Sequence, residues 1–390
     1  MSPRPLAVGL NLVYLVRDSG GAGRYARELI PAMLALEPET RICAFVSGEV
    51  PEDVLAAPWA DRVEWVRFPI TVTHGPPGNF ALTMGAQWGL LPLLAARRRL
   101  DVVHGLANIA PLVAPRVTTV VTLLDLIWIH FPQTMSRRAT VGMKMVAPVS
   151  ARRADRVVAI SEAAKDDIAS TLGLGRERID VTPLGINLDE GVAPADEGEV
   201  RAKLGLGDDP VVLCVAQKRE HKNLAGLVRA HAQLADRRAR LVLPGSPTPH
   251  EAELRALAAE LGTADRVHFP AWVEDAELEA LYRLARAFVL PSFVEGFGLP
   301  ILEAMRRGVP VACSNVSSLP EVAGDAALTF DPHRPEAIAA AVDRLLADGD
   351  LRVRLAARGQ ERCREFTWER TARETLATYH RAIAGRRARR

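Results

Sequence analysis

Residues 289–305, VLPSFVEGFGLPILEAM, read as a strand, a glycine-rich loop and a helix in succession. The apolar run that ends at Leu290 predicts a buried strand, because short apolar runs bounded by turn residues are typical of parallel sheets. Pro300 suits the first turn of the helix that follows. Open α/β sheets bind their ligands at such strand-to-helix loops, so this stretch predicts both a fold class and a site.

Two carboxylates mark this candidate site, one in the loop at Glu295 and one on the helix at Glu303. Gly296 and Gly298 leave backbone N–H groups accessible to a ligand that faces Glu295. Two acids at this spacing are common by chance in a chain with 47 acidic residues, so the spacing alone is weak evidence. The flanking Gly-Phe-Gly-Leu-Pro makes the pattern specific.

The same alternation of strands and helices extends over the chain. Strand-like runs occupy residues 6–16, 41–46, 63–68, 102–104, 118–124 and 156–160 and, after a polar stretch at 187–199, residues 211–216, 239–243, 266–269, 287–290 and 309–313. This pattern predicts the α/β class, with parallel sheets covered on both faces. Its restart predicts two Rossmann-like, doubly wound domains at 1–190 and 195–365. Residues 366–384 predict one amphipathic helix, and the basic tail 385–390 is expected to fray.

Composition excludes several classes of protein. The 49 basic and 47 acidic residues give a net charge of +2, so no strong overall field attracts nucleic acid. The four cysteines lie far apart, which predicts neither a zinc site nor a disulfide framework and suits a reducing cytosol. The N-terminus lacks a signal-peptide pattern, and no apolar run approaches the ~20 residues that cross a bilayer. We therefore expect a cytoplasmic protein.

Residues 88–100, WGLLPLLAARRRL, join an apolar stretch to three arginines. A core-facing helix that ends in basic residues is the explanation that we favour. Peripheral contact with the inner face of a membrane is the alternative.

A second glycine-rich loop, residues 18–24 (DSGGAGR), lies between the first strand and a helix expected to begin near Arg24. Gly20, Gly21 and Gly23 let the backbone approach a ligand, and a helix N-terminus favours a phosphate there. The loop matches neither the dinucleotide fingerprint nor a P-loop. A tight turn that binds nothing explains it equally well.

Together these stretches resemble the motifs of family-4 retaining glycosyltransferases, which have the GT-B fold. Glu295 and Glu303 resemble the family's E-x7-E element. Other segments match in the same order: residues 20–25 the N-terminal glycine loop, 122–126 the Thr-x-His-Asp-Leu segment, 158–162 the Val-x-x-x-Ser segment, 215–223 the Gly-Arg-x(4)-Lys loop, and 317–321 and 366–368 two later motifs. The resemblance implies two domains facing across a cleft, an N-terminal one for the acceptor and a C-terminal one for a nucleotide sugar. It also implies that the helix at 366–384 crosses back to the N-terminal domain.

The resemblance assigns a role to each motif residue. Glu295 is expected to accept a hydrogen bond from a donor-sugar hydroxyl, and Glu303 to bind the two ribose hydroxyls. Lys222 is expected to neutralise the diphosphate. The backbone amides of Gly296, Phe297, Gly298 and Leu299, and those of Gly20, Gly21 and Gly23 from the other domain, are expected to hold sugar or phosphate oxygens.

Two departures from the family pattern affect these expectations. Gln217 stands where the family has an arginine, so we expect Arg219, with Lys218 as the alternative, to supply the second positive charge. Leu124 stands where the family usually has a histidine near the 6-hydroxyl of the donor sugar. An apolar side chain there predicts a 6-deoxyhexose or pentose donor, with a hexose such as mannose or glucose otherwise.

Another histidine, His104 or His130, is a candidate to replace the missing imidazole, although a histidine satisfied within the core or a loop explains both positions more simply. Asp125 and Ser161 are candidate substrate-binding residues, and Trp88 and His74 are further candidates to line the acceptor site. The sequence leaves the acceptor open among a lipid-linked saccharide, a polysaccharide precursor and a secondary metabolite, each with a hydroxyl to receive the sugar.

The implied reaction is a same-face substitution in which the diphosphate leaves and one of its oxygens accepts the proton of the acceptor. This scheme needs no metal and no cofactor, since the nucleotide sugar is a substrate. The only D-x-D, at 348–350, is expected to serve a turn. The alternatives are a catalytically silent nucleotide-sugar-binding protein and a GT-B-like epimerase. A dinucleotide-dependent dehydrogenase is disfavoured because the fingerprint glycines are missing.

Overall fold

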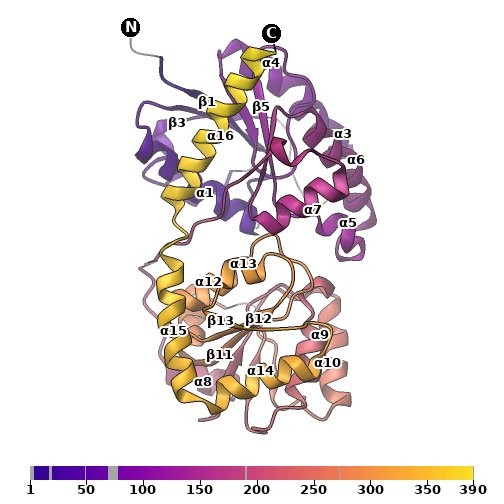
Figure 1. The fold of residues 1–390 in the computed structure, drawn as a ribbon, viewed down its shortest axis with the longest axis vertical. Coiled ribbons are helices and arrows are strands. Elements are labelled where there is room, and N and C mark those ends of the chain that lie inside the picture. Colours follow the sequence, from indigo (N-terminus) through magenta and orange to yellow (C-terminus); the bar gives the residue numbers. More distant parts are fainter. Residues whose placement is uncertain are drawn as a thin grey trace. The chain divides into compact units, whose positions relative to one another are not determined.

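The computed structural model describes residues 4–16, 20–48, 50–68, 78–188, 191–271 and 273–389. The chain divides into two compact units, of which the first comprises Met1–Gly185 with Trp368–Arg390 and the second Ile186–Thr367 (Figure 1). The last helix therefore belongs to the first unit, as the resemblance implies. The division falls at residue 185, a few residues before the boundary of 190 that we drew from the sequence.

The first unit contains a parallel sheet of seven strands in the order β3-β2-β1-β4-β5-β6-β7. The strands are β1 (Ala7–Leu12), β2 (Arg41–Val46), β3 (Val63–Arg67), β4 (Val102–Gly105), β5 (Thr118–Leu123), β6 (Arg156–Ala159) and β7 (Ile179–Val181). The helices are α1 (Gly20–Leu36), α2 (Glu52–Leu55), α3 (Gly78–Gly85), α4 (Leu91–Arg97), α5 (Ile127–His130), α6 (Arg137–Arg153), α7 (Glu162–Leu172) and α16 (Trp368–Ala388), and a π-helical turn, η2 (Ala86–Leu90), joins α3 to α4.

The register of this sheet shows which helices cover which face. Gly9, Cys43 and Val103 lie in one row across β1, β2 and β4, and the same face continues through Val121 of β5 and Val157 of β6. Helix α4 packs on this face over β1, β2 and β4, and α6 and α7 pack on it over β5 and β6. The outer sides of α4 and α6 therefore point away from the same face of the sheet.

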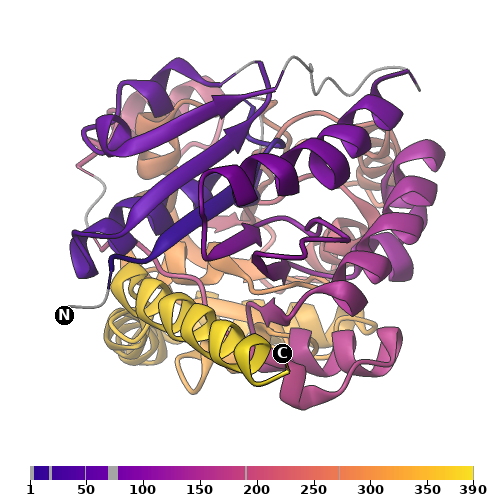
Figure 2. The same ribbon diagram turned by 90° about the horizontal axis from the view of Figure 1, so that it is seen from above.

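The opposite face is covered by α1 and by the C-terminal helix α16, which is yellow in Figures 1 and 2. Tyr25 of α1 stacks on Trp368 of α16 with ring centroids 6.3 Å apart. Our expectation of a frayed tail is wrong, because α16 continues through Gly385 to Ala388. Arg386 holds this last turn by an ion pair of 2.7 Å to Asp155.

The second unit contains a parallel sheet of six strands in the order β10-β9-β8-β11-β12-β13. The strands are β8 (Val211–Leu213), β9 (Arg240–Val242), β10 (Val267–His268), β11 (Ala285–Leu290), β12 (Val311–Ser314) and β13 (Ala327–Phe330). The helices are α8 (Glu197–Leu204), α9 (Leu224–His231), α10 (His250–Glu260), α11 (Asp275–Leu284), α12 (Leu299–Arg306), α13 (Leu319–Ala323), α14 (Pro335–Ala347) and α15 (Gly349–Cys363). Both sheets confirm the predicted doubly wound α/β class.

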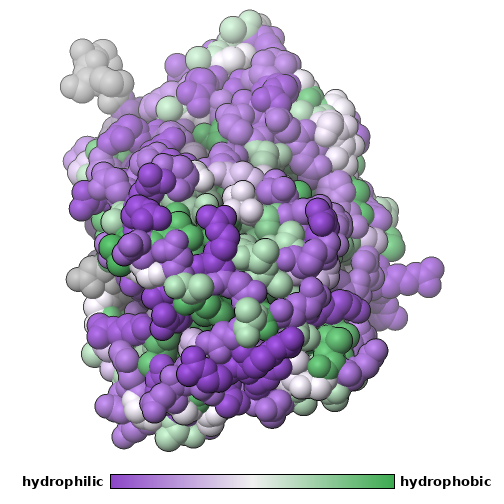
Figure 3. All heavy atoms as spheres, turned by 60° about the horizontal axis from the view of Figure 1, so that its bottom comes forward, coloured by the Kyte–Doolittle hydropathy of each residue, from purple (hydrophilic) through white to green (hydrophobic). Residues whose placement is uncertain are grey.

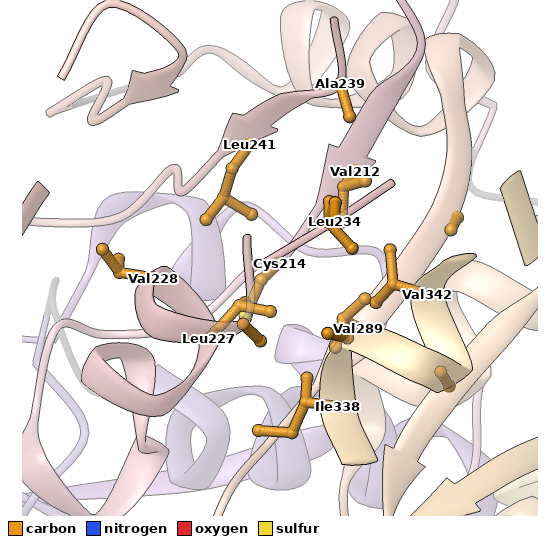
Figure 4. Close-up of a cluster of buried hydrophobic side chains, with 14 of the residues drawn as sticks. Val212, Cys214, Leu227, Val228, Leu234, Ala239, Leu241, Val289, Ile338 and Val342 are labelled. Atoms are coloured by element: carbon orange, nitrogen blue, oxygen red, sulfur yellow. The ribbon is translucent and has the colours of Figure 1, made fainter. Parts of the chain in front are cut away.

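A buried apolar cluster holds the strands of this second unit in place. Val212 of β8, Leu241 of β9 and Val289 of β11 meet Leu227 of α9 and Ile338 of α14 (Figure 4). All five side chains are essentially inaccessible to solvent. Their packing fixes the positions at which β8 and β11 end, and both of these ends carry residues of the predicted site.

The helix predicted to begin near Arg24 begins at Gly20. Gly20 has a φ of 53°, in the region that glycine adopts readily. Within the described part of the chain, no helix is both long and apolar enough to span a bilayer. The face of the molecule drawn in Figure 3 is mostly hydrophilic, with hydrophobic residues in small groups between polar ones.

Candidate functional site

The order of the second sheet reverses between β8 and β11, which are neighbours although six elements of the chain separate them. Such a switch point leaves room for a ligand beyond the carboxyl ends of the two strands. The loop after β8 and the loop after β11 are tied together here, because the backbone N–H of Phe293 donates to the carbonyl oxygen of His221 over 2.9 Å. Asn223 adds a second tie by donating to the carbonyl oxygen of Pro291 over 3.1 Å.

Lys222 and Glu295 meet at this point. The ammonium Nζ of Lys222 lies 2.6 Å from Oε1 of Glu295, and the hydroxyl of Ser292 donates to the same oxygen over 2.7 Å. The side chains of Lys222 and Glu295 are 17% and 9% exposed, so solvent screens this pair weakly. The structure therefore brings together two residues that lie 73 positions apart and that the sequence assigned to one site.

Two serines after β12 hold the backbone of the Glu295 loop. The hydroxyl of Ser317 donates to the carbonyl oxygen of Glu295 over 2.7 Å and accepts from its N–H over 3.1 Å. The hydroxyl of Ser318 donates to the carbonyl oxygen of Phe297 over 2.8 Å. Because the two serines hold the carbonyl groups of Glu295 and Phe297, the loop has a defined backbone conformation. In this conformation it can present N–H groups to a ligand.

Gly298 completes the turn into α12 with a φ of 104°, which side chains other than glycine rarely allow. A Cβ atom at this position would lie 2.6 Å from Cδ2 of Leu319. Both the backbone angle and the lack of space therefore require glycine here. Pro300 lies in the first turn of α12, as predicted.

Glu303 lies on α12 one turn beyond this point and is half-buried. The hydroxyl of Tyr282 donates to its Oε2 over 3.2 Å, and burial, followed by the nearby charge of Glu303, raises the pKa of Tyr282 well above its usual value. The guanidinium of Arg307 lies 4.3 Å from the centre of the Tyr282 ring. These contacts fix the carboxylate orientation, which suits the role of accepting two hydroxyl hydrogen bonds that the resemblance implies for Glu303.

The two candidates for the second positive charge have different surroundings. Lys218 is fully buried and donates to the carbonyl oxygen of Gly245 over 2.5 Å, with Glu251 3.2 Å away. Burial lowers the pKa of Lys218. Arg219, in contrast, is half-buried and donates from Nε to the side-chain oxygen of Gln217 over 2.9 Å. Of the two, Arg219 is the one whose side chain contacts Gln217, the residue that stands where the family has an arginine.

His221 adds no positive charge. Burial, followed by the nearby charge of Lys222, lowers the pKa of His221 to about 4. The imidazole is therefore neutral at physiological pH.

Comparison with known proteins agrees with this geometry. Two family models match the chain, "Glycosyltransferase Family 4" over residues 19–190 and "Glycosyl transferases group 1" over residues 196–362. The MMP alpha-(1->4)-mannosyltransferase of Mycolicibacterium hassiacum is 31% identical over 325 residues, which cover 75% of this chain and 73% of that protein. The chain belongs to glycosyltransferase family 4. The O-antigen chain mannosyltransferase B of Escherichia coli is 37% identical over 228 residues, which cover 57% of this chain but only 60% of that protein.

Among solved structures, this family-4 chain resembles the sucrose-phosphate synthase of Thermosynechococcus elongatus. The TM-score is 0.76 at 25% identity, and the match covers 97% of this chain and 99% of that one. The GT-B fold predicted from the motifs is thereby confirmed.

The first unit of the family-4 chain contains the remaining predicted residues. Gly20 and Gly21 are exposed at the first turn of α1, and a Cβ atom on either would meet nothing within 4 Å, while Gly23 is buried in the same helix. Residues 17–19 of the glycine loop lie outside the described residues. Leu124 directly follows β5 and is half-buried.

Asp125 and Ser161 have local structural roles in this unit. Asp125 accepts a hydrogen bond from the N–H of Ile127 over 3.0 Å at the start of α5. Ser161 is fully buried and caps α7 by accepting from the N–H of Ala164 over 3.0 Å. Both contacts position backbone, which is compatible with a substrate role and does not require one.

His104 and His130, the two histidines considered as substitutes for the missing imidazole, both have ring nitrogens that contact other side chains. Both ring nitrogens of His104 lie 2.8 Å from hydroxyls, those of Tyr379 and Thr122, and the side chain is fully buried. Nε2 of His130 lies 2.9 Å from the carboxylate of Asp167. His74, a candidate for the acceptor site, lies outside the described residues, and Trp88 is half-buried within η2.

The site also contains residues that the sequence did not single out. Tyr282, Ser318 and Asn223 hold Glu303, the Glu295 loop and the β8 loop respectively. Asn223 lies in the motif at 215–223 and Ser318 in the one at 317–321, so the sequence contained a signal for both. Asp348 of the D-x-D caps α15 by accepting from Leu351 N–H over 2.8 Å, and among the described residues no three or more His, Cys, Asp or Glu side chains gather to hold a metal.

Proposed function

We propose that the chain is a retaining glycosyltransferase that moves a sugar from a nucleotide-diphosphate sugar to a hydroxyl acceptor. The observation that carries this proposal is the convergence of Lys222, Glu295 and Ser292 at the switch point of the second sheet, with Glu303 one turn along the adjoining helix. In this proposal Glu303 binds the ribose hydroxyls and Glu295 a hydroxyl of the sugar. Lys222, Arg219 and the amides of residues 296–299 stabilise the diphosphate.

The proposed reaction is a same-face substitution without a metal. The bond between the anomeric carbon and the diphosphate oxygen breaks, the acceptor oxygen bonds to the same face of that carbon, and the acceptor proton passes to the leaving diphosphate. The protein's contribution is to position the two substrates and to stabilise the charge that develops on the diphosphate. Glu295 does not act as a nucleophile in this scheme.

Two observations bear on the donor sugar. The names of the two curated relatives described above indicate mannosyl transfer, which supports a sugar of mannose configuration. Leu124 supports a sugar without a 6-hydroxyl, since its half-buried side chain offers no hydrogen bond. A donor of 6-deoxymannose configuration satisfies both, and mannose is the hexose alternative. The acceptor is a hydroxyl on a glycan, a lipid-linked saccharide or a secondary metabolite.

The test incubates the protein with UDP-, GDP- and dTDP-sugars, each as hexose, 6-deoxyhexose and pentose where the sugar exists. Mass spectrometry follows the free nucleoside diphosphate and any change in the sugar, and added hydroxyl acceptors allow transfer. Selective release of one diphosphate, with a product whose anomeric configuration matches the donor by NMR, supports the proposal. Conversion of the donor into an isomer without release would identify an epimerase, and binding without any turnover a silent nucleotide-sugar-binding protein.

A further inference from the structure

Exposed apolar side chains are concentrated on one part of the first unit. Among the described residues, seven of the eleven strongly exposed large hydrophobic side chains lie between positions 82 and 149: Leu82, Leu90, Leu93, Val113, Val141, Met145 and Val149. Leu93 is 61% exposed and Met145 66%. Single exposed apolar residues are ordinary, but a cluster of them on neighbouring elements marks an interaction surface.

Six of these side chains lie on α3, η2, α4 and α6 and form what we call the α4–α6 surface. Val141, Met145 and Val149 repeat at intervals of four, which places them in one stripe along the outer side of α6. Leu90 and Leu93 lie one turn apart at the η2–α4 junction. Since α4 and α6 cover the same face of the sheet, both stripes point outward on the same side, where α3 and α6 also lie in Figures 1 and 2.

The charges of the α4–α6 surface have a single sign. Residues 78–97 and 137–153 contain Arg97, Arg137, Arg138, Lys144, Arg152 and Arg153 and no Asp or Glu, in a chain whose totals are almost balanced at 49 basic and 47 acidic residues. The three acids of the neighbouring α7 are engaged locally, Glu162 and Asp166 with Arg176 and Asp167 with His130. The outward side of α4 and α6 is therefore both apolar and positive.

The positive character continues beyond the end of α4. A pocket of about 640 Å³ lies between this end, the start of β5 and the last turns of α16. Its lining includes five arginines and one acid: Arg4, Arg99, Arg116, Arg386, Arg387 and Asp101. Asp101 pairs with Arg4 and Asp155 with Arg386, so the net positive charge of the pocket comes from Arg99, Arg116 and Arg387. An anionic group that binds at the C-terminal end of α4 can therefore contact the arginines of this pocket as well.

We propose that the α4–α6 surface docks the protein on an anionic phospholipid bilayer. Apolar side chains flanked by Lys and Arg are what helices use to lie in a bilayer interface, where the apolar groups enter the acyl boundary and the cations meet lipid phosphates. A second copy of the chain is a poorer occupant, because a symmetric contact would place basic residues against basic residues. The proposal rests on the first unit alone and does not depend on the proposed transfer reaction.

The test is co-sedimentation of the full chain with vesicles of phosphatidylcholine, with and without phosphatidylglycerol. We expect binding to the anionic vesicles only, weakened by added salt. Replacing Leu93 and Met145 by serine removes apolar contact, and replacing Arg138 and Lys144 by glutamate reverses charge. Each pair should lower the partition coefficient by at least about fivefold, since one basic residue near such a surface, or one apolar side chain buried in it, contributes at least roughly that factor.

The matched control alters the second unit. Val353 is 70% exposed on α15 beside the exposed Arg354, so Val353→Ser with Arg354→Glu makes one change of each kind away from the surface. Partition of this variant should equal that of the unaltered protein, and unchanged melting temperatures show that the variants fold. The proposal is overturned if the unaltered protein stays in the supernatant, or if the control loses as much binding as the test variants. A dimer in light scattering that Leu93→Ser and Met145→Ser dissociate, without vesicle binding, would assign the surface to self-association instead.

Discussion

Lys222 Nζ lies 2.6 Å from Oε1 of Glu295, so the charge proposed to meet the diphosphate is already paired with a carboxylate. A diphosphate that approaches Lys222 also approaches Glu295, and the two anions repel each other. Binding of a nucleotide sugar must therefore loosen this pair or share Lys222 between the two anions. The hydrogen bond from Ser292 helps Glu295 to keep its position during such an exchange.

This arrangement makes Glu295→Gln a variant with opposite effects on two measurements. Glutamine keeps the size of the side chain but removes the negative charge, so Lys222 becomes available to the diphosphate. We expect the affinity for the nucleoside diphosphate alone to rise severalfold, while sugar transfer falls about 100-fold because a charged hydrogen bond to the sugar is lost. Calorimetry and turnover measure the two quantities. Lys222→Ala serves as the contrast, since both quantities should fall, and a fall of diphosphate affinity in Glu295→Gln would count against the charge argument.

Arg219 is expected to act as the second cation. The Arg219→Ala variant should lose about tenfold in kcat/KM, the effect of one partly screened charge on the leaving group. Introducing the family arginine by Gln217→Arg into this variant should restore most of the activity, because the new guanidinium starts from the side chain that Arg219 now contacts. Steady-state kinetics of the two variants decide the point. Full activity of Arg219→Ala by itself would show that one cation is enough.

Leu124 is expected to select the donor sugar. Leu124→His restores the family residue, so activity with a hexose donor should rise relative to that with its 6-deoxy form by about tenfold or more. The measurement is the ratio of kcat/KM for mannose and 6-deoxymannose donors of the same nucleotide. Leu124→Met, which keeps an apolar side chain of similar size, is the matched control and should leave the ratio unchanged. An unaltered enzyme that prefers the hexose severalfold would refute the role of Leu124.

Three buried histidines predict a loss of stability in acid. Burial lowers the pKa of His104 to about 3 and is the main cause that lowers the pKa of His221 and His231 to about 4, against an ordinary value of 6.5. The unfolded chain therefore takes up protons as the pH falls below 6.5 while the folded chain does not. Stability is fully present above pH 6.5 and is lost toward pH 4, by about 1.4 kcal/mol per pH unit for each histidine.

Thermal unfolding between pH 7.5 and 4.5 measures this dependence on the intact chain. His231→Gln keeps a donor for the carbonyl oxygen of Ala239, 2.8 Å from Nε2 in the native protein, and should flatten the pH dependence. His380, whose side chain is 60% exposed, provides the control, because His380→Gln should leave the pH dependence as it is. Equal slopes for all three proteins would show that buried histidines do not carry the effect.

The sequence predicted the fold correctly where apolar runs were long and bounded by turn residues. β2 has the bounds expected for it, Arg41–Val46, whereas two strands were not predicted, β7 (Ile179–Val181) and β13 (Ala327–Phe330). Both are short and lie at the edges of their sheets, where a strand needs little apolar sequence of its own. β7 and β13 form because they pair with β6 and β12, and no local sequence pattern indicates that pairing.

The candidate site shows the same limit. The motifs named Lys222 and Glu295, but their direct contact depends on the adjacency of β8 and β11, which the sequence does not state. The sequence left Lys218 as the alternative to Arg219, and only the fold shows that the Lys218 side chain turns inward to Gly245 and Glu251. The last turns of α16 form because Arg386 reaches Asp155, 231 positions away. In each case a long-range contact decides what local chemistry leaves open.

The donor site in the second unit is the central claim, and nucleotide binding tests it most directly. Isothermal titration of UDP, GDP and dTDP into the unaltered protein should find one that binds, and Glu303→Ala should weaken it by about 10- to 100-fold, the effect of losing charged hydrogen bonds to the ribose. Glu253→Ala is the control, since this carboxylate is 75% exposed on α10 and should leave binding unchanged. Equal affinity in Glu303→Ala and the unaltered protein, or no binding of any of the three nucleotides, would contradict the assignment.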